Sequence, residues 1–377
     1  MRILFVGDAS NFHSTLAGAL RELGHEAVVV SDGSTWMDTP RDIDLTRRPG
    51  KAGAVAYVAS LARALPKMRG FDVVHIVNPV FLKLRPWKVR RVFDYLRRNN
   101  RLLFLSALGT DYEYVRACTA RGLFRYSDYR VGDQPSPYML SDESIGQDAW
   151  LRPSMHRHND YIINGVDGIV ACMYEYYATY QAVAPHKLCH AGVPIDTRAI
   201  EPVEMHQAPE KVRFFIGIQR KRDVLKGTDR LLAAARRVRD RMPGQCDITV
   251  VENLPYREYL RSLRGSHVIL EQLYSYTPAT TALTAMATGL VAVSGAEPEY
   301  YDLIGERDNR PIINALPYDD SQIDQALQRI VERRGDLPRL SHMSREFVVK
   351  HNDSLTVARR HIDFWNKIST IKTGKEL

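Results

Sequence analysis

The segment His267–Asp302 constrains the fold more than any other part of the chain, because it contains a complete strand–helix–strand pattern. It opens with a short apolar run, and Leu290–Ser294 forms a second one, as expected of two buried strands. Between them, Thr277 and Pro278 are favoured at the start of a helix, and Gly289 is favoured just beyond its end. The free N–H groups of such a helix can hold an anion, although the pattern also fits an ordinary βαβ unit.

Continuously apolar runs separated by helical patterns recur through both halves of the chain. Such runs are typical of parallel strands that are covered by helices on both faces. With 377 residues, the chain is long enough for two domains of this α/β class. The predicted strands are Ile3–Gly7, Ala27–Ser31, Phe71–Val77, Arg101–Ser106, Gly165–Met173, Lys187–Asp196, Val212–Ile218 and Cys246–Glu252.

A polar, proline-bearing stretch, Glu201–Lys211, is the predicted linker between the two domains. It separates a first domain, residues 1–200, from a second domain, residues 212–343, which is followed by a helical tail at residues 344–377. The segment Tyr112–Asn159 lacks a clean period, and long irregular segments of this kind are often lids or binding loops.

The cysteines and the apolar content indicate where the protein works. Four cysteines, at positions 118, 172, 189 and 246, lack the paired spacing of a disulfide framework or a zinc site, which favours a reducing environment. No stretch approaches the roughly 20 apolar residues that span a bilayer, and the amino-terminal sequence does not resemble a signal peptide. We therefore expect a cytoplasmic protein, or one that works at the inner face of the plasma membrane.

The formal net charge is +8, from 52 basic and 44 acidic residues, and it is unevenly spread. The segment Lys83–Arg101 carries eight basic residues against one acid, Asp94, with Trp87 and other apolar residues between them. This pattern is typical of a basic amphipathic helix that rests on an anionic membrane, and it also fits a solvated helix face. No nucleic-acid-binding module is recognisable, so nucleic acid is not an expected partner.

The second half of the opening segment resembles a known family signature. Ala285–Glu299 reads AMATGLVAVSGAEPE, which is similar to the donor-site signature of nucleotide-sugar glycosyltransferases with the GT-B fold. After the AMA triplet, Gly289 falls in register; beyond a loop that is shorter by three residues, Gly295 and the Pro298-Glu299 pair align again. The resemblance implies that this loop contacts the donor sugar, through its backbone and through the side chain of Glu297.

The family normally carries two acidic residues, eight positions apart, where this chain has Tyr276 and Thr284. The second acid usually accepts hydrogen bonds from the ribose hydroxyls of the nucleotide. Thr284 can make one neutral hydrogen bond there, whereas a carboxylate makes charge-assisted bonds that are roughly twice as strong. The resemblance therefore implies that donor recognition is altered or partly moved to other groups, or that the enzyme is weakened.

A second resemblance lies upstream, at Phe215–Ala234, and includes a cluster of cations. This stretch reads FIGIQRKRDVLKGTDRLLAA and is similar to a family pattern in which an Arg and a Lys bind the donor diphosphate. The Lys corresponds to Lys226, and the Arg corresponds to either Arg220 or Arg222, because the loop is longer than usual. Fixed cations can stabilise the charge that builds on a leaving diphosphate. A basic surface loop is the alternative interpretation.

Two loops of the first domain also carry candidate residues. The turn Leu108–Asp111 is similar to a G-T-D turn of the family, which implies that Asp111 binds the donor sugar or the acceptor; a helix N-cap is the alternative. The loop after the first strand is implied to line the acceptor side. Its candidate residues are Gly7, Asp8, Asn11 and His13, and His13 is either a general base or an exposed loop histidine.

The resemblance implies an α/β fold with two Rossmann-like domains facing across a cleft, and a C-terminal helix that returns to the first domain. It implies a metal-independent, retaining transfer from a nucleoside-diphosphate sugar to a glycan or lipid-linked acceptor, with no further cofactor. Two alternatives stay open: a non-hydrolysing sugar-nucleotide epimerase, and a non-catalytic binding protein with a decayed donor site. The implied site residues are catalytic Asp111, Lys226, Arg222 and Arg220, and donor-binding Gly217, Thr280, Thr281, Thr284, Gly295, Glu297 and Glu299.

Overall fold

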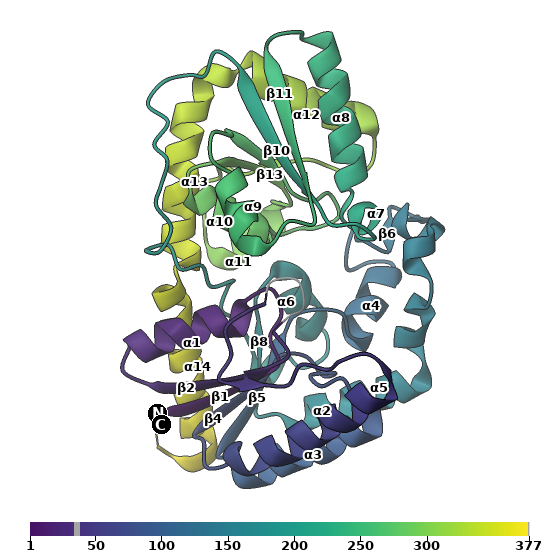
Figure 1. Ribbon diagram of the computed structural model, residues 1–377, viewed down its shortest axis with the longest axis vertical. Coiled ribbons are helices and arrows are strands. Elements are labelled where there is room, and N and C mark those ends of the chain that lie inside the picture. The colour runs from purple at the N-terminus through teal and green to yellow at the C-terminus, as the bar shows by residue number, and fades with distance from the viewer. Residues whose placement is uncertain (34–37, 376) are drawn as a thin grey trace. The chain divides into compact units, whose positions relative to one another are not determined.

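The computed structural model describes residues 1–33, 38–375 and 377, apart from the side chains of Tyr256 and Arg257. These residues form two compact units (Figure 1). Unit 1 contains Met1–Arg116, Asp148–Pro194 and Ser354–Leu377, and unit 2 contains Ala117–Gln147 and Ile195–Asp353. The units are therefore discontinuous in sequence, whereas the sequence analysis divides the chain into continuous domains.

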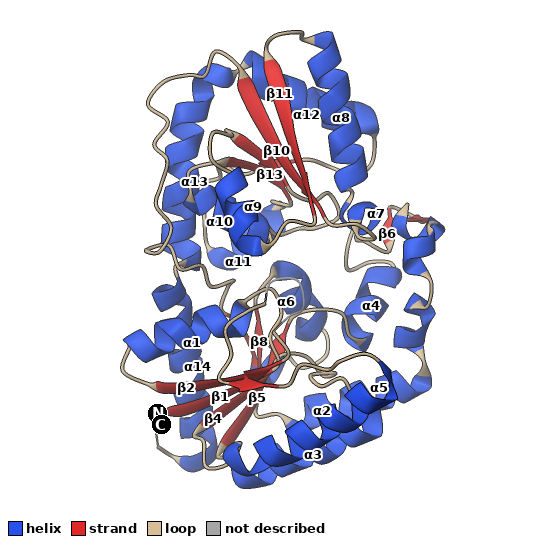
Figure 2. Ribbon diagram, in the orientation of Figure 1, coloured by secondary structure: helices blue, strands red, loops and turns tan. Residues whose placement is uncertain are grey.

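Unit 1 is built on a seven-stranded parallel sheet with the strand order β3-β2-β1-β4-β5-β8-β9. Helices cover both faces of this sheet (Figure 2), which explains why β4 and β8 are buried along their whole length. The strands are β1 Arg2–Val6, β2 Glu26–Ser31, β3 Ile43–Asp44, β4 Val73–Ile76, β5 Leu102–Ala107, β8 Gly168–Ala171 and β9 Leu188–His190. The helices are α1 Phe12–Glu22, α2 Gly50–Ala64, α3 Pro86–Asn99, α4 Tyr112–Thr119, α5 Pro153–Gly165 and α6 Tyr174–Gln181.

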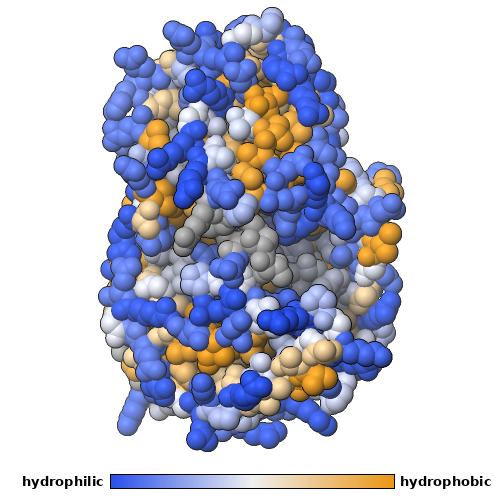
Figure 3. All heavy atoms as spheres, viewed as in Figure 1, coloured by the Kyte–Doolittle hydropathy of each residue, from blue (hydrophilic) through white to orange (hydrophobic). Residues whose placement is uncertain are grey.

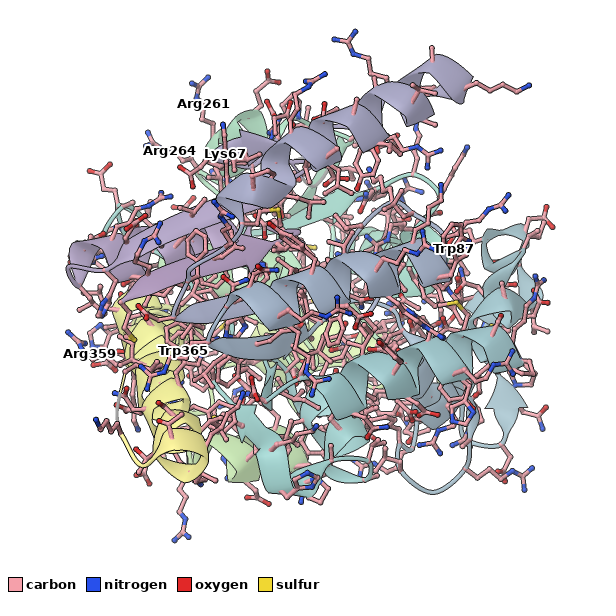
Figure 4. All side chains as sticks on the ribbon, turned by 90° about the horizontal axis from the view of Figure 1, so that it is seen from below. Lys67, Trp87, Arg261, Arg264, Arg359 and Trp365 are labelled. Carbon is pink, nitrogen blue, oxygen red and sulfur yellow. The ribbon has the colours of Figure 1, made fainter. Side chains whose placement is uncertain are left out.

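The last helix of the chain, α14 (Ser354–Thr373), packs on unit 1 against α1. Its residue Trp365 is fully buried, and the indole N–H donates to Nε2 of His75 at 2.8 Å (Figure 4). This return of the C-terminal helix to the first unit is confirmed. The helical tail expected from residue 344 is divided, because α13 (Leu337–Asn352) stays in unit 2 and the helix breaks at Asp353.

Unit 2 contains a five-stranded parallel sheet with the strand order β11-β10-β12-β13-β14. Its strands are β10 Val212–Ile218, β11 Cys246–Glu252, β12 Val268–Leu270, β13 Val291–Ser294 and β14 Ile313–Asn314. Its helices are α7 Asp223–Lys226, α8 Thr228–Arg241, α9 Tyr256–Ser262, α10 Thr280–Ala287, α11 Pro298–Ile304, α12 Asp320–Glu332 and α13. Two parallel sheets with helical crossovers confirm the predicted α/β class with two Rossmann-like units.

The segment Ala117–Gln147, which we call the arm, lies in the sequence between two segments of unit 1 but packs within unit 2. It contains a two-stranded antiparallel ribbon of β6 (Arg130–Val131) and β7 (Gln134–Pro135). Val131 packs against the hydrophobic core of unit 2, which includes residues of β10, α8 and β12. Among the described residues, no helix is long and apolar enough to cross a membrane.

Candidate functional site

The carboxyl ends of β10 and β12 bring the two sequence signatures of unit 2 together. After β10, the chain passes through α7 to Gly227, whose φ is +71°. A Cβ on Gly227 would lie 2.9 Å from Cδ1 of Leu273, so both the backbone and the space favour glycine here. The N–H of Leu273, in the loop after β12, donates to the carbonyl of Lys226 at 2.9 Å. Residues 219–227, which we call the cationic loop, are therefore hydrogen-bonded to the loop that leads into α10.

Lys226 and Glu271 carry the charge at the centre of this site. Glu271 directly follows β12 and is 3% exposed. Its Oε2 accepts hydrogen bonds from Ser294 Oγ at 2.7 Å and from the N–H of Ala279 at 3.3 Å, while its Oε1 has no hydrogen-bond partner among the described residues. Burial lowers the pKa of Lys226, and the negative charge of Glu271 opposes that shift. The carboxylate thus favours the protonated lysine beside the loop that enters α10.

Helix α10 begins later than the sequence predicts. Thr277 and Pro278 were expected at its N-cap and first position, but the N-cap is Ala279. The reason is local: Ser275 Oγ donates to the carbonyl of Thr277 at 2.6 Å and accepts from its N–H at 3.2 Å, which holds Thr277 in a turn. The helix dipole and the free N–H groups therefore start at Thr280.

The loop after β13 lies against the loop before α10. A Cβ on Gly295 would lie 2.0 Å from the carbonyl oxygen of Ser275, so the two backbones are in contact and glycine is required. Thr280 and Thr281 form the first turn of α10 and are partly exposed, whereas Thr284 is only 3% exposed. The first turn of α10 is thus open to a ligand, and Thr284 faces the interior of unit 2.

The remaining candidates of the cationic loop differ in their surroundings. Arg220 forms an ion pair with Glu252 at 2.9 Å, and its side chain is 75% exposed. Arg222 is the N-cap of α7, and its charge contributes to lowering the pKa of Lys226. A Cβ on Gly217 would lie 2.6 Å from the ring of Tyr259, so this position of β10 packs beneath an aromatic side chain. Of the two arginines, Arg222 is therefore the one whose charge reaches Lys226.

Glu297 and Glu299, the predicted sugar contacts, are bound by the arm. Arg125 Nη2 lies 2.6 Å from Glu297 Oε2 and 3.1 Å from Glu299 Oε2, and Arg125 Nη1 also donates to Glu299. Tyr126 donates its hydroxyl hydrogen to Oε1 of Glu297, and Asn314 Nδ2 donates to the same oxygen at 3.0 Å. Glu297 is 4% exposed, so these partners surround it.

Tyr276, which stands where the family has its first acid, is also part of this contact. Its hydroxyl oxygen accepts the backbone N–H of Arg125 at 2.6 Å, and the Arg125 guanidinium lies 5.2 Å from the centre of its ring. The rings of Tyr126 and Tyr276 are 4.9 Å apart. Tyr276 therefore binds the arm in this structure.

In unit 1, Asp111 is fully buried after β5. Its Oδ1 accepts the N–H of Tyr114 at 2.9 Å, which caps α4, and its Oδ2 accepts the hydroxyl of Tyr180 at 2.8 Å. Burial raises the pKa of Asp111 to about 6, and the bonds from Tyr114 and Tyr180 oppose that shift. Asp111 therefore acts as a cap within the interior of unit 1 in this structure.

The loop after β1 is held by its own hydrogen bonds. His13 is fully buried, and its ring nitrogens lie 2.6 Å from the carbonyl oxygen of Gly7 and 2.9 Å from Ser106 Oγ. The expectation of an exposed loop histidine is therefore wrong, because α1 begins at Phe12 and carries His13 into the core. Asp8 accepts the N–H of His13 at 2.9 Å, and Asn11 is the N-cap of α1 with φ +63°.

One group of residues in the described part of the chain has the composition and spacing of a cation site. Glu113 on α4, and His156 and Asp160 on α5, place their ligand atoms within 4.8 Å of one another. Glu113 is already paired with Arg116 at 2.7 Å, and His156 lies 3.3 Å from Asp160. The three side chains thus have partners within unit 1.

Sequence reasoning missed Glu271 and the contacts made by Arg125 and Tyr126, although it indicated the surrounding segment Tyr112–Asn159 as a lid or binding loop. Glu271 is the first residue after a buried strand, at the edge where parallel sheets bind ligands, and this position could have singled it out. Arg125 and Tyr126 carry no such signal, because their partners Glu297 and Glu299 lie more than 170 positions away in the sequence.

Comparisons with known proteins agree with this architecture. No family model matches the chain, and no curated protein matches it by sequence. Among solved structures, sucrose-phosphate synthase from Thermosynechococcus elongatus is similar over 98% of this chain and 100% of its own, with a TM-score of 0.65 and 14% identity. Anabaena HepE, in complex with UDP and glucose, is similar over 96% of this chain and 98% of its own, with a TM-score of 0.60 and 11% identity.

A third similar structure belongs to another reaction class. A candidate UDP-N-acetylglucosamine 2-epimerase from Listeria monocytogenes is similar over 100% of this chain and 97% of its own, with a TM-score of 0.55 and 10% identity. Structural similarity at 10–14% sequence identity shows that the proteins share a fold. The protein therefore has the GT-B fold, which is the fold of nucleotide-sugar glycosyltransferases.

Proposed function

We propose that the protein is a glycosyltransferase that binds a nucleoside-diphosphate sugar through unit 2. The observation that carries the proposal is the bonded contact between the Lys226 loop and the loop that enters α10. A cation beside free helix N–H groups is what a diphosphate requires. HepE with UDP and glucose, and an Arabidopsis starch synthase with ADP and acarbose, share the fold and support this class of ligand.

The proposed chemistry depends on the leaving diphosphate. When the sugar–phosphate bond breaks, negative charge builds on the diphosphate, and a site that stabilises this charge lowers the barrier. Lys226 and Arg222 would supply positive charge, and the N–H groups of Thr280 and Thr281 would supply hydrogen bonds. Because these cations belong to the chain, we propose that the transfer needs no metal. From the family resemblance alone, we also propose that it retains the anomeric configuration. The catalytic role of Asp111 stays a prediction.

We propose that unit 1 binds the acceptor, a glycan or a lipid-linked sugar. A cavity of about 150 Å³ lies at the carboxyl ends of its strands, and Gly7 and Asp8 line it together with Tyr57 and Phe81. Asp32 and Lys83, which form an ion pair, also line this cavity. Apolar walls with one acid and one ion pair suit a sugar ring, whose faces are apolar and whose edges carry hydroxyl groups.

We further propose that unit 1 rests on an anionic membrane surface while it uses such an acceptor. Trp87 (labelled in Figure 4) lies at the start of α3 and is 49% exposed. Lys88 and Arg91 lie over its ring, at 5.3 and 4.8 Å from the centroid. On α2, Val55 is 72% exposed. Figure 3 shows apolar residues among the hydrophilic surface at the lower end of the view. Exposed apolar groups beside basic residues suit the inner face of a plasma membrane and the synthesis of a surface polysaccharide.

Calorimetric titration with nucleoside diphosphates tests the donor site. We expect one of UDP, ADP or GDP to bind, and Lys226→Ala to weaken that binding by about 1.5–3 kcal/mol, as for a hydrogen bond to a charged group. Lys221→Ala is the matched control, because Lys221 is an exposed lysine of the same loop. Equal affinities for Lys226→Ala and wild type would remove Lys226 from the site.

A sugar-nucleotide epimerase is the second candidate, and the likeness to the Listeria structure favours it. An epimerase needs no acceptor, whereas a glycosyltransferase does. Incubation with UDP-N-acetylglucosamine alone, followed by separation of the epimers, distinguishes the two. Formation of an epimer without any acceptor would replace the glycosyltransferase proposal.

A non-catalytic binding protein is the third candidate. It is favoured by Tyr276 and Thr284, which replace the family's acids, and by the engagement of Tyr276 with the arm. A thermal-shift screen across nucleotide sugars tests it. A complete lack of stabilisation by any nucleotide sugar would support this candidate.

A further inference from the structure

The arm contacts unit 2 at two of the places where a donor is expected. One contact is made by Arg125 and Tyr126 with Glu297 and Glu299, in the loop after β13. The other is made by Glu143 with α7, in the cationic loop. We propose that the arm is an internal latch that, in the free protein, covers the predicted sugar contacts Glu297 and Glu299 and a backbone N–H of α7, and must be displaced when a nucleotide sugar binds. This proposal rests on the proposed function and adds the regulation of that site.

At the first contact, the arm uses the hydrogen-bonding capacity that a sugar would need. Both carboxylate oxygens of Glu297 are bonded, Oε1 to Tyr126 and Asn314 and Oε2 to Arg125. Arg125 also makes two bonds to Glu299. A sugar hydroxyl that approached either acid would compete with a guanidinium, which is the stronger partner of a carboxylate.

At the second contact, the arm places a negative charge in the loop expected to bind phosphate. Glu143 Oε2 accepts the backbone N–H of Leu225 at 3.1 Å, one residue before Lys226. Burial raises the pKa of Glu143, bonds from α7 oppose that shift, and the neighbouring Asp223 adds to it. A carboxylate bonded to backbone N–H groups occupies them as a phosphate oxygen would, and its charge repels an incoming diphosphate.

The outer ion pair of this contact is accessible to solvent. The side chains of Arg125 and Glu299 are 50% and 33% exposed, and an ion pair with this access to solvent contributes little stability, whereas the side chain of Glu297 is only 6% exposed. The regular structure of the arm consists of two-residue strands, the end of α4 and short 3-10 turns. Leu140 and Ile145 of the arm are 78% and 79% exposed, whereas Tyr126, Tyr129 and Tyr138 are at most 4% exposed, so release of the arm must expose these aromatic rings.

The test is the affinity of Arg125→Gln for UDP and ADP, measured by calorimetry on the full chain. Simple electrostatics predicts weaker binding of an anion when a positive charge is removed. The latch predicts tighter binding, because the apparent affinity rises with the fraction of molecules whose site is open; for a latch that is closed nine times in ten, the gain is about tenfold. The two explanations therefore predict opposite signs.

Two further variants accompany this test. Arg121→Gln is the matched control, because it removes the same charge from the arm at a side chain that is 76% exposed. Arg121 pairs with Asp133 and not with Glu297 or Glu299, so this variant should leave the affinity unchanged. Glu143→Gln acts at the other contact and should also tighten binding, but removal of a negative charge predicts the same sign without a latch, so Arg125→Gln is the deciding variant. Thermal melts identify any variant that fails to fold, and if Arg125→Gln fails to fold, hydrogen exchange of the wild type decides.

Hydrogen exchange supplies a second readout. UDP or ADP should increase exchange in Ala117–Gln147 and decrease it around Lys226. Tighter binding by Arg125→Gln, with or without detectable binding by wild type, supports the latch. If wild type binds and Arg125→Gln does not bind more tightly, the latch is refuted and the donor site stands. If no protein binds either nucleotide, the proposed function fails together with the latch.

Discussion

The two units offer their candidate residues at the same place, the carboxyl edge of a parallel sheet, yet the surroundings of these residues differ. In unit 1, Asp111 and His13 are fully buried and bonded to groups of their own unit. In unit 2, Lys226 and the first turn of α10 remain partly exposed, and the neighbouring Glu271 keeps one oxygen without a hydrogen-bond partner among the described residues. A position at the sheet edge therefore does not by itself make a residue accessible to a ligand.

The largest expected difference between the units is their response to acid. Burial lowers the pKa of His361 and of His190 in unit 1 to about 4. Because these histidines titrate near pH 6.5 in the unfolded chain, the unfolded chain takes up protons first as the pH falls, so their contribution to the stability of unit 1 is lost between pH 6.5 and 4. Each histidine should cost about 2 kcal/mol at pH 5.

Urea unfolding at pH 7.5 and pH 5, followed by tryptophan fluorescence, measures this effect, since the tryptophans of the described part of the chain, Trp87, Trp150 and Trp365, belong to unit 1. In unit 2, ion pairs and backbone hydrogen bonds lower the pKa of Glu306, although burial opposes this shift. The ionised Glu306 therefore stabilises unit 2 until the pH falls below about 4.5, which is below the pH range that affects unit 1. An unfolding midpoint that is unchanged at pH 5 would contradict the account of unit 1.

The second prediction concerns Asp111 as a structural residue. Asp111→Ala removes the cap of α4 and leaves the hydroxyl of Tyr180 without its acceptor, so the free energy of unfolding should fall by about 2–4 kcal/mol. Nucleotide affinity should stay at the wild-type value. Asp111→Asn keeps the cap and is the milder control. A stable Asp111→Asn protein that binds nucleotide but has no transferase activity would instead support the catalytic role.

The third prediction separates the two arginines of unit 2. Arg222 acts on Lys226, whereas Arg220 is paired with Glu252. Arg222→Ala should weaken nucleoside-diphosphate binding by about 1.5 kcal/mol, and Arg220→Ala by less than about 0.5 kcal/mol. Titration of both variants against the same nucleotide measures the difference, and the reverse order would move the phosphate towards Arg220.

The smallest expected effect concerns the membrane. Arg91→Ala on α3 should weaken binding to vesicles that contain phosphatidylserine by about 1 kcal/mol. Arg239→Ala is the control, because it removes the same charge from an exposed position of a basic helix in unit 2. Sedimentation with vesicles measures both variants. Equal losses would show that net charge, and not the surface of unit 1, determines the binding.

The sequence predicts the sheets of both units well because their strands are fixed by local apolar runs. β10 and β11 match the predicted ranges Val212–Ile218 and Cys246–Glu252. The start of α10 was missed because the bonds of Ser275 to Thr277 compete with the helix, and such competition depends on side-chain geometry. The packing of the arm was missed for a different reason.

The arm is held by contacts between residues that are distant in sequence. Val131 reaches the core of unit 2 and Arg125 reaches Glu297, and neither contact leaves a periodic pattern in the chain. The irregular segment Tyr112–Asn159 was predicted as a lid or binding loop, but its partner could not be inferred from local propensity. The role of Glu297 and Glu299 therefore required the structure.

The most direct test of the account is a crystal structure of the protein with bound UDP or ADP. The account predicts a diphosphate within hydrogen-bond distance of Lys226 and of the N–H groups of Thr280 and Thr281. A nucleotide bound in unit 1 alone, with Lys226 and α10 unchanged, would contradict it.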